Sequence, residues 1–309
     1  MGRRKKGDKI DGWVNFDKPL GMTSTQAVGK VRRAYNAQKV GHAGTLDPLA
    51  TGVLPIALGE ATKTIPYTQD ALKTYEFTVR WGEQRSTDDA EGEVIAISDM
   101  RPTPDAIEAA LPAFTGEITQ TPPRFSAIKI DGQRAYDLAR DGQEFEIKSR
   151  TVFIESLSLL SHDTDTASFT MTCGKGTYVR SLARDLALEL GTVGYISALR
   201  RARVGVFGED HAILLDKLQE MGDKADLEAA LLPVETALDD ILAFPIRQDE
   251  AAALRNGQVL SLVSRPDFER IEAIGAQNGS EILVICDGKP VALTRFESPS
   301  LKPFKVFNL

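Results

Sequence analysis

Apolar and polar side chains alternate along several stretches of this 309-residue chain, most regularly between residues 75 and 81. Every second position there is apolar and the positions between are polar, which gives the apolar set Tyr75, Phe77, Val79 and Trp81. Because successive side chains of a strand point to opposite faces, this pattern predicts a strand buried on one face. Apolar runs also predict a short strand at 12–17, a strand from Val53, and a pair at 152–160 and 167–173.

Helical spacing replaces alternation between residues 24 and 35, where apolar side chains recur every three or four positions. Thr23 precedes this stretch and Gln26 follows three residues later, which is the spacing of a capping box at a helix N-terminus. We therefore predict a helix over 24–35. Shorter helices are predicted over 60–68 and 104–113.

The C-terminal part of the chain follows an acidic segment at 209–240 that we predict to be helical. This segment ends near Pro245, where we place a domain boundary. Short strands are predicted beyond it at 282–286 and 290–296. The chain is therefore predicted to contain two domains, a large one over residues 1–245 and a small β domain over 246–309.

The net charge of −7 argues against a nucleic-acid partner only until the charges are located. Residues 1–63 contain eleven Lys and Arg against five Asp and Glu, and residues 171–203 contain six against two. The acidity lies in residues 209–250, which contain three basic residues against twelve acidic ones. A polyanion can therefore bind locally to a chain whose total charge is negative.

Cysteine and histidine usage gives no sign of a disulfide framework or of metal-ligand spacing, because Cys173 and Cys286 and all three histidines are scattered. No apolar stretch approaches the roughly 20 residues that span a bilayer. Residues 1–9 are basic but lack the apolar stretch of a signal peptide, and we predict a flexible arm there. We expect a cytoplasmic protein without a membrane, metal or cofactor.

The candidate for chemistry is Asp47, within a loop over 41–52 that contains three glycines and leads into an apolar run. Pro48 biases Asp47 away from the helical region, so a stiff and irregular loop is expected to fix this carboxylate in place. A surface turn in which Asp47 bonds to its own backbone explains the loop equally well. The loop alone does not decide between the two interpretations.

Residues 41–56 closely resemble the signature loop of the TruB family of tRNA pseudouridine-55 synthases. Three further stretches, 18–24, 122–132 and 174–186, resemble other motifs of the family and follow in family order. The resemblance covers about residues 10–205. It implies an α+β pseudouridine synthase fold with a central mixed β-sheet flanked by helices. It also implies a small C-terminal PUA-like β domain that contributes to RNA binding.

The resemblance assigns roles to individual residues. Catalytic roles are implied for Asp47, for Tyr75, which packs against the target base, and for Arg180, the counter-charge of the aspartate. Substrate contacts are expected from His42, Tyr178, Leu199, Lys18, Arg124 and Lys129.

Several of these assignments have a structural alternative. The turn that follows Lys18 is interpreted mainly as a support for the Asp47 loop, and Leu199 would be assigned to the core on sequence grounds alone. In the family, the residue that matches His42 stacks in the RNA loop vacated by the flipped nucleotides. Asp88, Asp89 and Glu91 lie in a polar turn, and we interpret them as solvated rather than as metal ligands.

The implied activity is isomerisation of uridine 55 in the T-loop of tRNA, after the target base has been flipped out of its stack. The reaction conserves atoms and transfers no electrons, so no cofactor is expected. We expect a monomer that acts without a guide RNA. The alternatives are an RNA-binding chaperone, a guide-dependent relative, and a glycosidase, which usually needs a second carboxylate that does not stand out beside Asp47.

Overall fold

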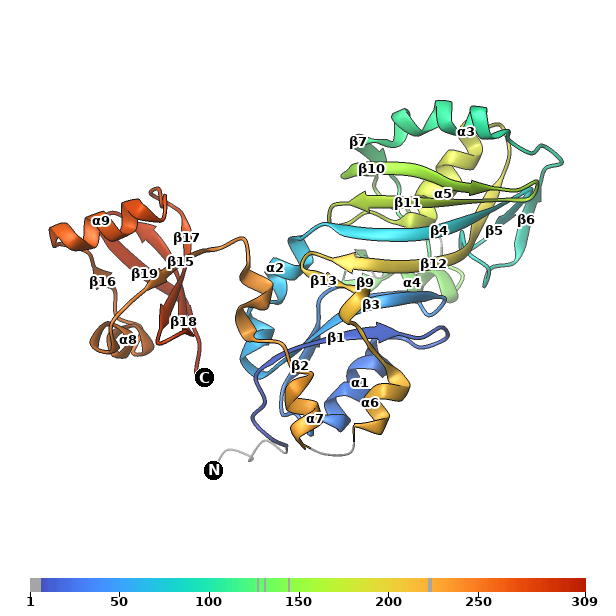
Figure 1. Cartoon of the computed structure of the whole chain (residues 1–309). Helices are drawn as coiled ribbons and strands as arrows, with labels where there is room; N and C mark the ends of the chain where they lie inside the picture. Colours follow the sequence, from blue (N-terminus) through green and yellow to red (C-terminus); the bar gives the residue numbers. More distant parts are fainter. Residues whose placement is uncertain (1–6, 127, 131, 144, 222–223) are drawn as a thin grey trace.

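The computed structural model describes residues 7–126, 128–130, 132–143, 145–221 and 224–309. A mixed sheet of ten strands forms the larger part of the protein (Figure 1). Its strands are β1 (Gly12–Lys18), β2 (Val40–His42), β3 (Ala50–Leu58), β4 (Lys73–Trp81), β7 (Gly116–Gln120), β10 (Arg150–His162), β11 (Thr166–Cys173), β12 (Gly194–Val204), β13 (Phe207–Gly208) and β14 (Ile213–Leu214). The main order is β14-β1-β3-β12-β4-β11-β10-β7, with β2 paired to β3 and β13 to β12.

Helices pack on this sheet (Figure 1). The α-helices of this part are α1 (Ser24–Ala34), α2 (Ile65–Asp70), α3 (Pro104–Ala110), α4 (Ala135–Arg140), α5 (Val179–Glu189), α6 (Leu215–Glu220) and α7 (Lys224–Ala229). Short 3-10 helices are η1 (Gly59–Lys63), η2 (Leu111–Phe114), η3 (Glu209–His211) and η4 (Val234–Leu238). Two small hairpins complete it, β5 (Glu83–Arg85) with β6 (Val94–Ile97) and β8 (Lys129–Ile130) with β9 (Gln133–Arg134). Among the described residues, no helix has the length and apolar character needed to cross a membrane.

Two apolar clusters hold the helices on the sheet. One cluster joins α5, through residues such as Leu182 and Leu186, to the alternating apolar side chains of β4 and β11. The other joins Ala27 and Val31 of α1 to β1 and β3. These clusters explain why α1 and α5 form where their apolar spacing is helical, because each buries one apolar face on the sheet.

The predicted helix over 24–35 and its capping box are confirmed. The Thr23 hydroxyl accepts from the backbone N–H of Gln26, and the Gln26 side chain accepts from the backbone N–H of Thr23. The prediction over 60–68 is wrong in one respect, since the segment is divided into η1 and α2. Pro66 lacks the N–H that a continuous helix would need there.

The C-terminal part is a five-stranded sheet with two helices. It contains β15 (Leu242–Pro245), β16 (Leu260–Ser261), β17 (Glu281–Cys286), β18 (Lys289–Glu297), β19 (Ser300–Val306), α8 (Gln248–Arg255) and α9 (Arg265–Ala273). Its strand order is β15-β17-β18-β19-β16, so this sheet begins at Leu242, a few residues before the predicted boundary.

The C-terminal sheet packs beside η1 and α2 (Figure 1). The Tyr67 hydroxyl of α2 donates to the Glu281 carboxylate at 2.6 Å. Leu283, Leu293 and Phe307 share a buried apolar cluster with Trp13 of the large domain. At the other end of the chain, residues 1–6 of the predicted arm lie outside the described residues.

Candidate active site

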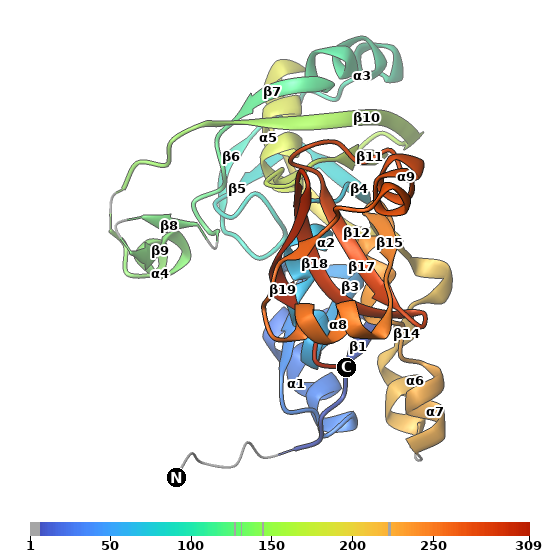
Figure 2. The ribbon, with the colours of Figure 1, turned by 90° about the vertical axis from the view of Figure 1, so that its left-hand side faces the viewer.

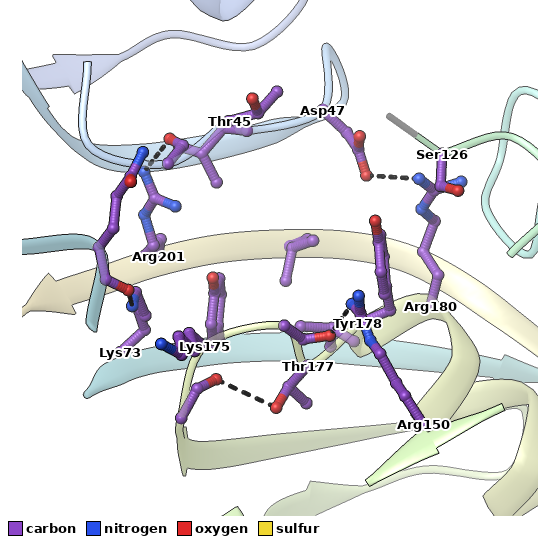
Figure 3. A pocket seen from close by; sticks show the side chains of 18 residues that line it. Thr45, Asp47, Lys73, Ser126, Arg150, Lys175, Thr177, Tyr178, Arg180 and Arg201 are labelled. Carbon is purple, nitrogen blue, oxygen red and sulfur yellow. Dashed lines mark hydrogen bonds and ion pairs between the residues drawn. The ribbon is translucent and has the colours of Figure 1, made fainter. Parts of the chain in front are cut away.

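A cavity of about 330 Å³ lies between the Asp47 loop and the turn that precedes α5 (Figure 3). Strands β4 and β12, which are hydrogen-bonded neighbours, contribute residues between these two segments. Five residues of the sequence prediction line this cavity together: Asp47, Tyr75, Tyr178, Arg180 and Leu199. They come from four segments that are far apart in the sequence and meet because the sheet places them side by side.

Lys18 supports the Asp47 loop through hydrogen bonds to backbone carbonyls. This side chain is fully buried, and its ammonium donates to the carbonyls of Pro19, Met22 and Pro48. Burial lowers the pKa of Lys18 to about 8, although the nearby Asp47 charge opposes the shift. Ser24 adds two hydrogen bonds with the backbone of Leu46. Lys18 was expected to contact the substrate, but here it has no exposed surface and supports the loop.

The Asp47 carboxylate faces the cavity and is paired with Arg180. The distance from the carboxylate oxygen to Arg180 Nη2 is 2.9 Å, and the side chains are 39% and 5% exposed, respectively. Arg180 lies in the first turn of α5, and its Nη2 also donates to the Phe125 carbonyl at 2.9 Å. A carboxylate that is open to the cavity but paired with a buried guanidinium has its position fixed by that contact.

The expectation that Asp88, Asp89 and Glu91 are solvated is wrong for Asp88 and Asp89, whereas Glu91 is exposed. Both aspartates are 6% exposed, and each faces an arginine of α5. Asp88 pairs with Arg184 at 2.9 Å, and Asp89 lies 3.5 Å from Arg180 Nη1. Burial raises the pKa of Asp88, and Arg184 opposes this shift. Arg180 and Arg184 are four residues apart on one helix face, and two adjacent acids opposite such a pair are a signal that could have predicted this network.

Tyr75 and Leu199 lie on neighbouring antiparallel strands, β4 and β12, and both line the cavity. Tyr75 pairs in register with Arg201, two residues after Leu199 on the same face of β12. Burial raises the pKa of Tyr75, and Arg201 opposes this shift. The Tyr75 side chain is therefore an uncharged phenol at neutral pH.

Arg201 and Lys73 also line the cavity, although neither was predicted from the sequence. Arg201 is 1% exposed and donates to the carbonyls of Val53 at 2.8 Å and Gly44 at 3.1 Å. It packs where β3 and β12 run in parallel, and a Cβ on Gly52 would lie 2.3 Å from the Arg201 carbonyl oxygen. Leu199 and Arg201 are two residues apart on one strand and therefore lie on the same face. This spacing could have predicted that Arg201 lies beside Leu199 in the site.

Lys73 is also buried, and its ammonium donates to the carbonyls of Gln69 and Ala71 at the end of α2. Burial, with the Arg201 charge, lowers its pKa from the ordinary 10.5 to about 8. Between these values the unfolded chain binds more protons than the folded chain, so Lys73 adds stability as the pH rises from about 8 to 10.5.

We therefore expect the melting temperature of the wild type, relative to that of Lys73→Met, to increase between about pH 7.5 and about pH 9.5. The measurement is a series of thermal melts of both proteins at matched ionic strength. Lys18 titrates in the same window, but it is present in both proteins and cancels in the difference. Parallel curves would contradict the shifted pKa of Lys73.

The remaining predicted residues lie around the cavity. Tyr178 forms the N-cap of α5, and the guanidinium of Arg150 stacks on its ring at 5.1 Å. His42 ends β2 outside the lining, and burial lowers its pKa. Arg124 is exposed and stacks on Phe145 at 5.3 Å. Lys129 belongs to β8, and its side chain lies outside the described residues.

In the described part of the chain, no cluster of three His, Cys, Asp or Glu side chains is suited to a metal ion. The cavity instead combines one open carboxylate, its buried arginine partner and an aromatic ring on a long mixed sheet. Together with the fold, these features define the class of pseudouridine synthases.

Comparison with known proteins agrees. Residues 32–179 match the model of the TruB family pseudouridylate synthase N-terminal domain, and residues 180–239 match that of the tRNA pseudouridylate synthase B C-terminal domain. The chain is 53% identical to tRNA pseudouridine synthase B of Caulobacter vibrioides and 50% identical to that of Rhodospirillum rubrum, with 100% of each chain covered in both cases. The chain therefore belongs to the TruB family of pseudouridylate synthases.

The solved structures that resemble this one include a crystal structure of a Cbf5-Nop10-Gar1 complex. One chain of it matches with a TM-score of 0.71 and 26% identity, over 96% of this chain and 84% of that chain. This likeness supports the assigned fold over nearly the whole length of the chain.

Proposed function

We propose that this protein isomerises uridine 55 in the T-loop of tRNA to pseudouridine, with Asp47 as the catalytic carboxylate. The observation that carries the proposal is the Asp47–Arg180 pair, which opens into a cavity lined by Tyr75 and Leu199. The names of the relatives, tRNA pseudouridine synthase B, support tRNA as the substrate.

The reaction breaks the bond from ribose C1′ to uracil N1, turns the base, and joins C1′ to C5. The C5 proton is lost and N1 gains one, so the product is an isomer of the substrate. Asp47 acts at C1′ or at C6, and Arg180 holds its carboxylate in place. Tyr75 and Leu199 hold the detached uracil between them. An uncharged phenol is a weak proton acceptor, so the raised pKa of Tyr75 supports the stacking role more than the role of base.

The segment over 121–149 is the candidate RNA grip. Its hairpin β8–β9 and helix α4 project from the main sheet (Figure 2). Arg124 and Tyr136 lie in this segment, and interleaved basic and aromatic residues suit single-stranded RNA. The C-terminal domain, which begins at β15, adds a second RNA contact. The enzyme acts as a monomer without a guide RNA.

Release of tritium from C5-labelled uridine tests the proposal. Purified protein and a labelled tRNA transcript, with no other RNA present, should release the label of one uridine per tRNA. A transcript with cytidine at position 55 should release none. Binding without release would favour an RNA chaperone, and release that requires a further RNA would favour a guide-dependent enzyme. Mapping pseudouridine in tRNA from cells that lack the protein checks the position.

His42 is expected to act as an aromatic surface for the RNA. Burial lowers the pKa of His42, and a backbone contact with Gly44 opposes this shift, so the ring is neutral at pH 7. We expect His42→Phe to retain several times more activity than His42→Ala, by about threefold to tenfold, because stacking on a base contributes about 1–3 kcal/mol. Equal losses in single-turnover assays of the two variants would count against stacking.

A further inference from the structure

One buried hydroxyl in the cavity has no role in the site described so far. Ser126 lines the cavity, is 4% exposed, and its Oγ has no hydrogen-bond partner among the described residues. Buried polar groups are nearly always hydrogen-bonded, because an unpaired one loses its water without compensation. An enclosed and unpaired hydroxyl in a cavity that takes a polar substrate therefore points to a substrate atom as its partner.

The backbone fixes this hydroxyl beside the catalytic ion pair. The preceding carbonyl, that of Phe125, accepts from Arg180 Nη2, the same nitrogen that pairs with Asp47. The carbonyl of Ser126 itself accepts from the backbone N–H of Tyr136 at 3.0 Å. Figure 3 shows Ser126 at the end of the Asp47–Arg180 contact. Ser126 is therefore held at the end of the cavity where Asp47 lies.

We propose that the Ser126 hydroxyl binds the ribose 2′-hydroxyl of the target nucleotide and thereby distinguishes RNA from DNA at that nucleotide. This inference rests on the proposed function, because it takes C1′ of the target uridine to lie at Asp47. The 2′-hydroxyl is attached to the carbon next to C1′, so it lies at the same end of the cavity. Two hydroxyls suit each other, since each can donate and accept.

The ribose is a better partner than the base for a fixed side chain. The uracil turns during the reaction, and its oxygens change place, whereas the 2′-hydroxyl keeps its position relative to C1′. A hydrogen bond to the ribose can therefore be kept from the first bond that breaks to the last bond that forms. The 2′-hydroxyl is also the group by which proteins tell RNA from DNA.

The test is a double-mutant cycle in which one change is made in the protein and the other in the RNA. Ser126→Ala is combined with a T-arm RNA that carries a single 2′-deoxyuridine at the target position. Binding is measured in an Asp47→Asn background, so that the RNA stays unreacted. We expect each change alone to weaken binding by about threefold to tenfold, and both together to weaken it no more than either one. In the Asp47 enzyme, Ser126→Ala should lower kcat/KM on the all-ribose RNA by a similar factor.

Ser24 provides a matched control for stability, because it is also 4% exposed but has both of its hydrogen bonds made to Leu46. Ser24→Ala should lower the melting temperature of the free protein. Ser126→Ala should leave it unchanged or raise it, since the lost hydroxyl is unpaired there. An equal fall in both variants would make Ser126 a structural residue and overturn the proposal.

The outcomes distinguish a failure of the proposed function from a failure of the Ser126 assignment. If the unmodified enzyme releases no tritium from the all-ribose RNA, the proposed function fails. If it does release tritium but the effects of Ser126→Ala and of the 2′-deoxy substitution multiply, the Ser126 assignment alone fails. Ser126→Ala could also weaken binding of the all-ribose RNA but not of an RNA with 4-thiouridine at the target position. That result would place the contact on the base and would also overturn the Ser126 assignment.

Discussion

Asp47→Asn is expected to abolish turnover, by at least about a thousandfold in the single-turnover rate, while tRNA affinity changes by only a few fold. Removing a group that forms or breaks bonds in the transition state has effects of this size or larger. Asparagine keeps the shape of the side chain, and the supports of the loop, Lys18 and Ser24, bond to backbone atoms of neighbouring residues. The loop should therefore keep its position, and the loss should fall on the chemical step.

The control for this variant is Asp105→Asn, which removes the same charge from an exposed position of α3. Its turnover should equal that of the wild type. Both variants are compared by tritium release and by filter binding to the same transcript. An asparagine variant at position 47 with an undiminished rate would remove Asp47 from the chemistry.

Arg180→Ala is expected to lose about a hundredfold to a few thousandfold in turnover. Its removal leaves Asp47 and the buried Asp89 without their arginine partner. Breaking a buried pair from one side costs about 3–5 kcal/mol, and each 1.36 kcal/mol corresponds to about a tenfold change in rate. Arg180→Lys should recover only part of the activity, because one ammonium does not reach the several acceptors that the guanidinium contacts.

Arg184→Ala separates catalysis from folding. It breaks the corresponding pair with Asp88, four residues further along α5, without touching Asp47. Both alanine variants should lower the melting temperature, but the activity of Arg184→Ala should stay well above that of Arg180→Ala. Near-normal turnover of Arg180→Ala, or equal inactivity of both variants, would contradict the assigned role.

Sequence patterns predicted those strands and helices whose formation depends on neighbouring residues. The alternating residues of β4 form a half-buried strand because one face packs on α5, and the Thr23–Gln26 pair begins α1 because its hydrogen bonds are local. The predicted helix over 60–68 is interrupted because an apolar pattern does not show where a proline breaks the hydrogen bonding. The interpretation of Asp88 and Asp89 was wrong because only tertiary contact with α5 buries them and supplies their arginines.

The sequence by itself determined the family, the strands and helices with clear periodicity, and Asp47 as the candidate carboxylate, because these depend on residues that are close together along the chain. The tertiary structure decided which charges face one another: Lys18 beneath the loop rather than in the cavity, Arg201 behind Tyr75, and the arginines of α5 against Asp47, Asp88 and Asp89. These contacts join segments separated by tens of residues or more. Their burial and hydrogen bonding follow from sheet order and helix packing, which no local pattern encodes.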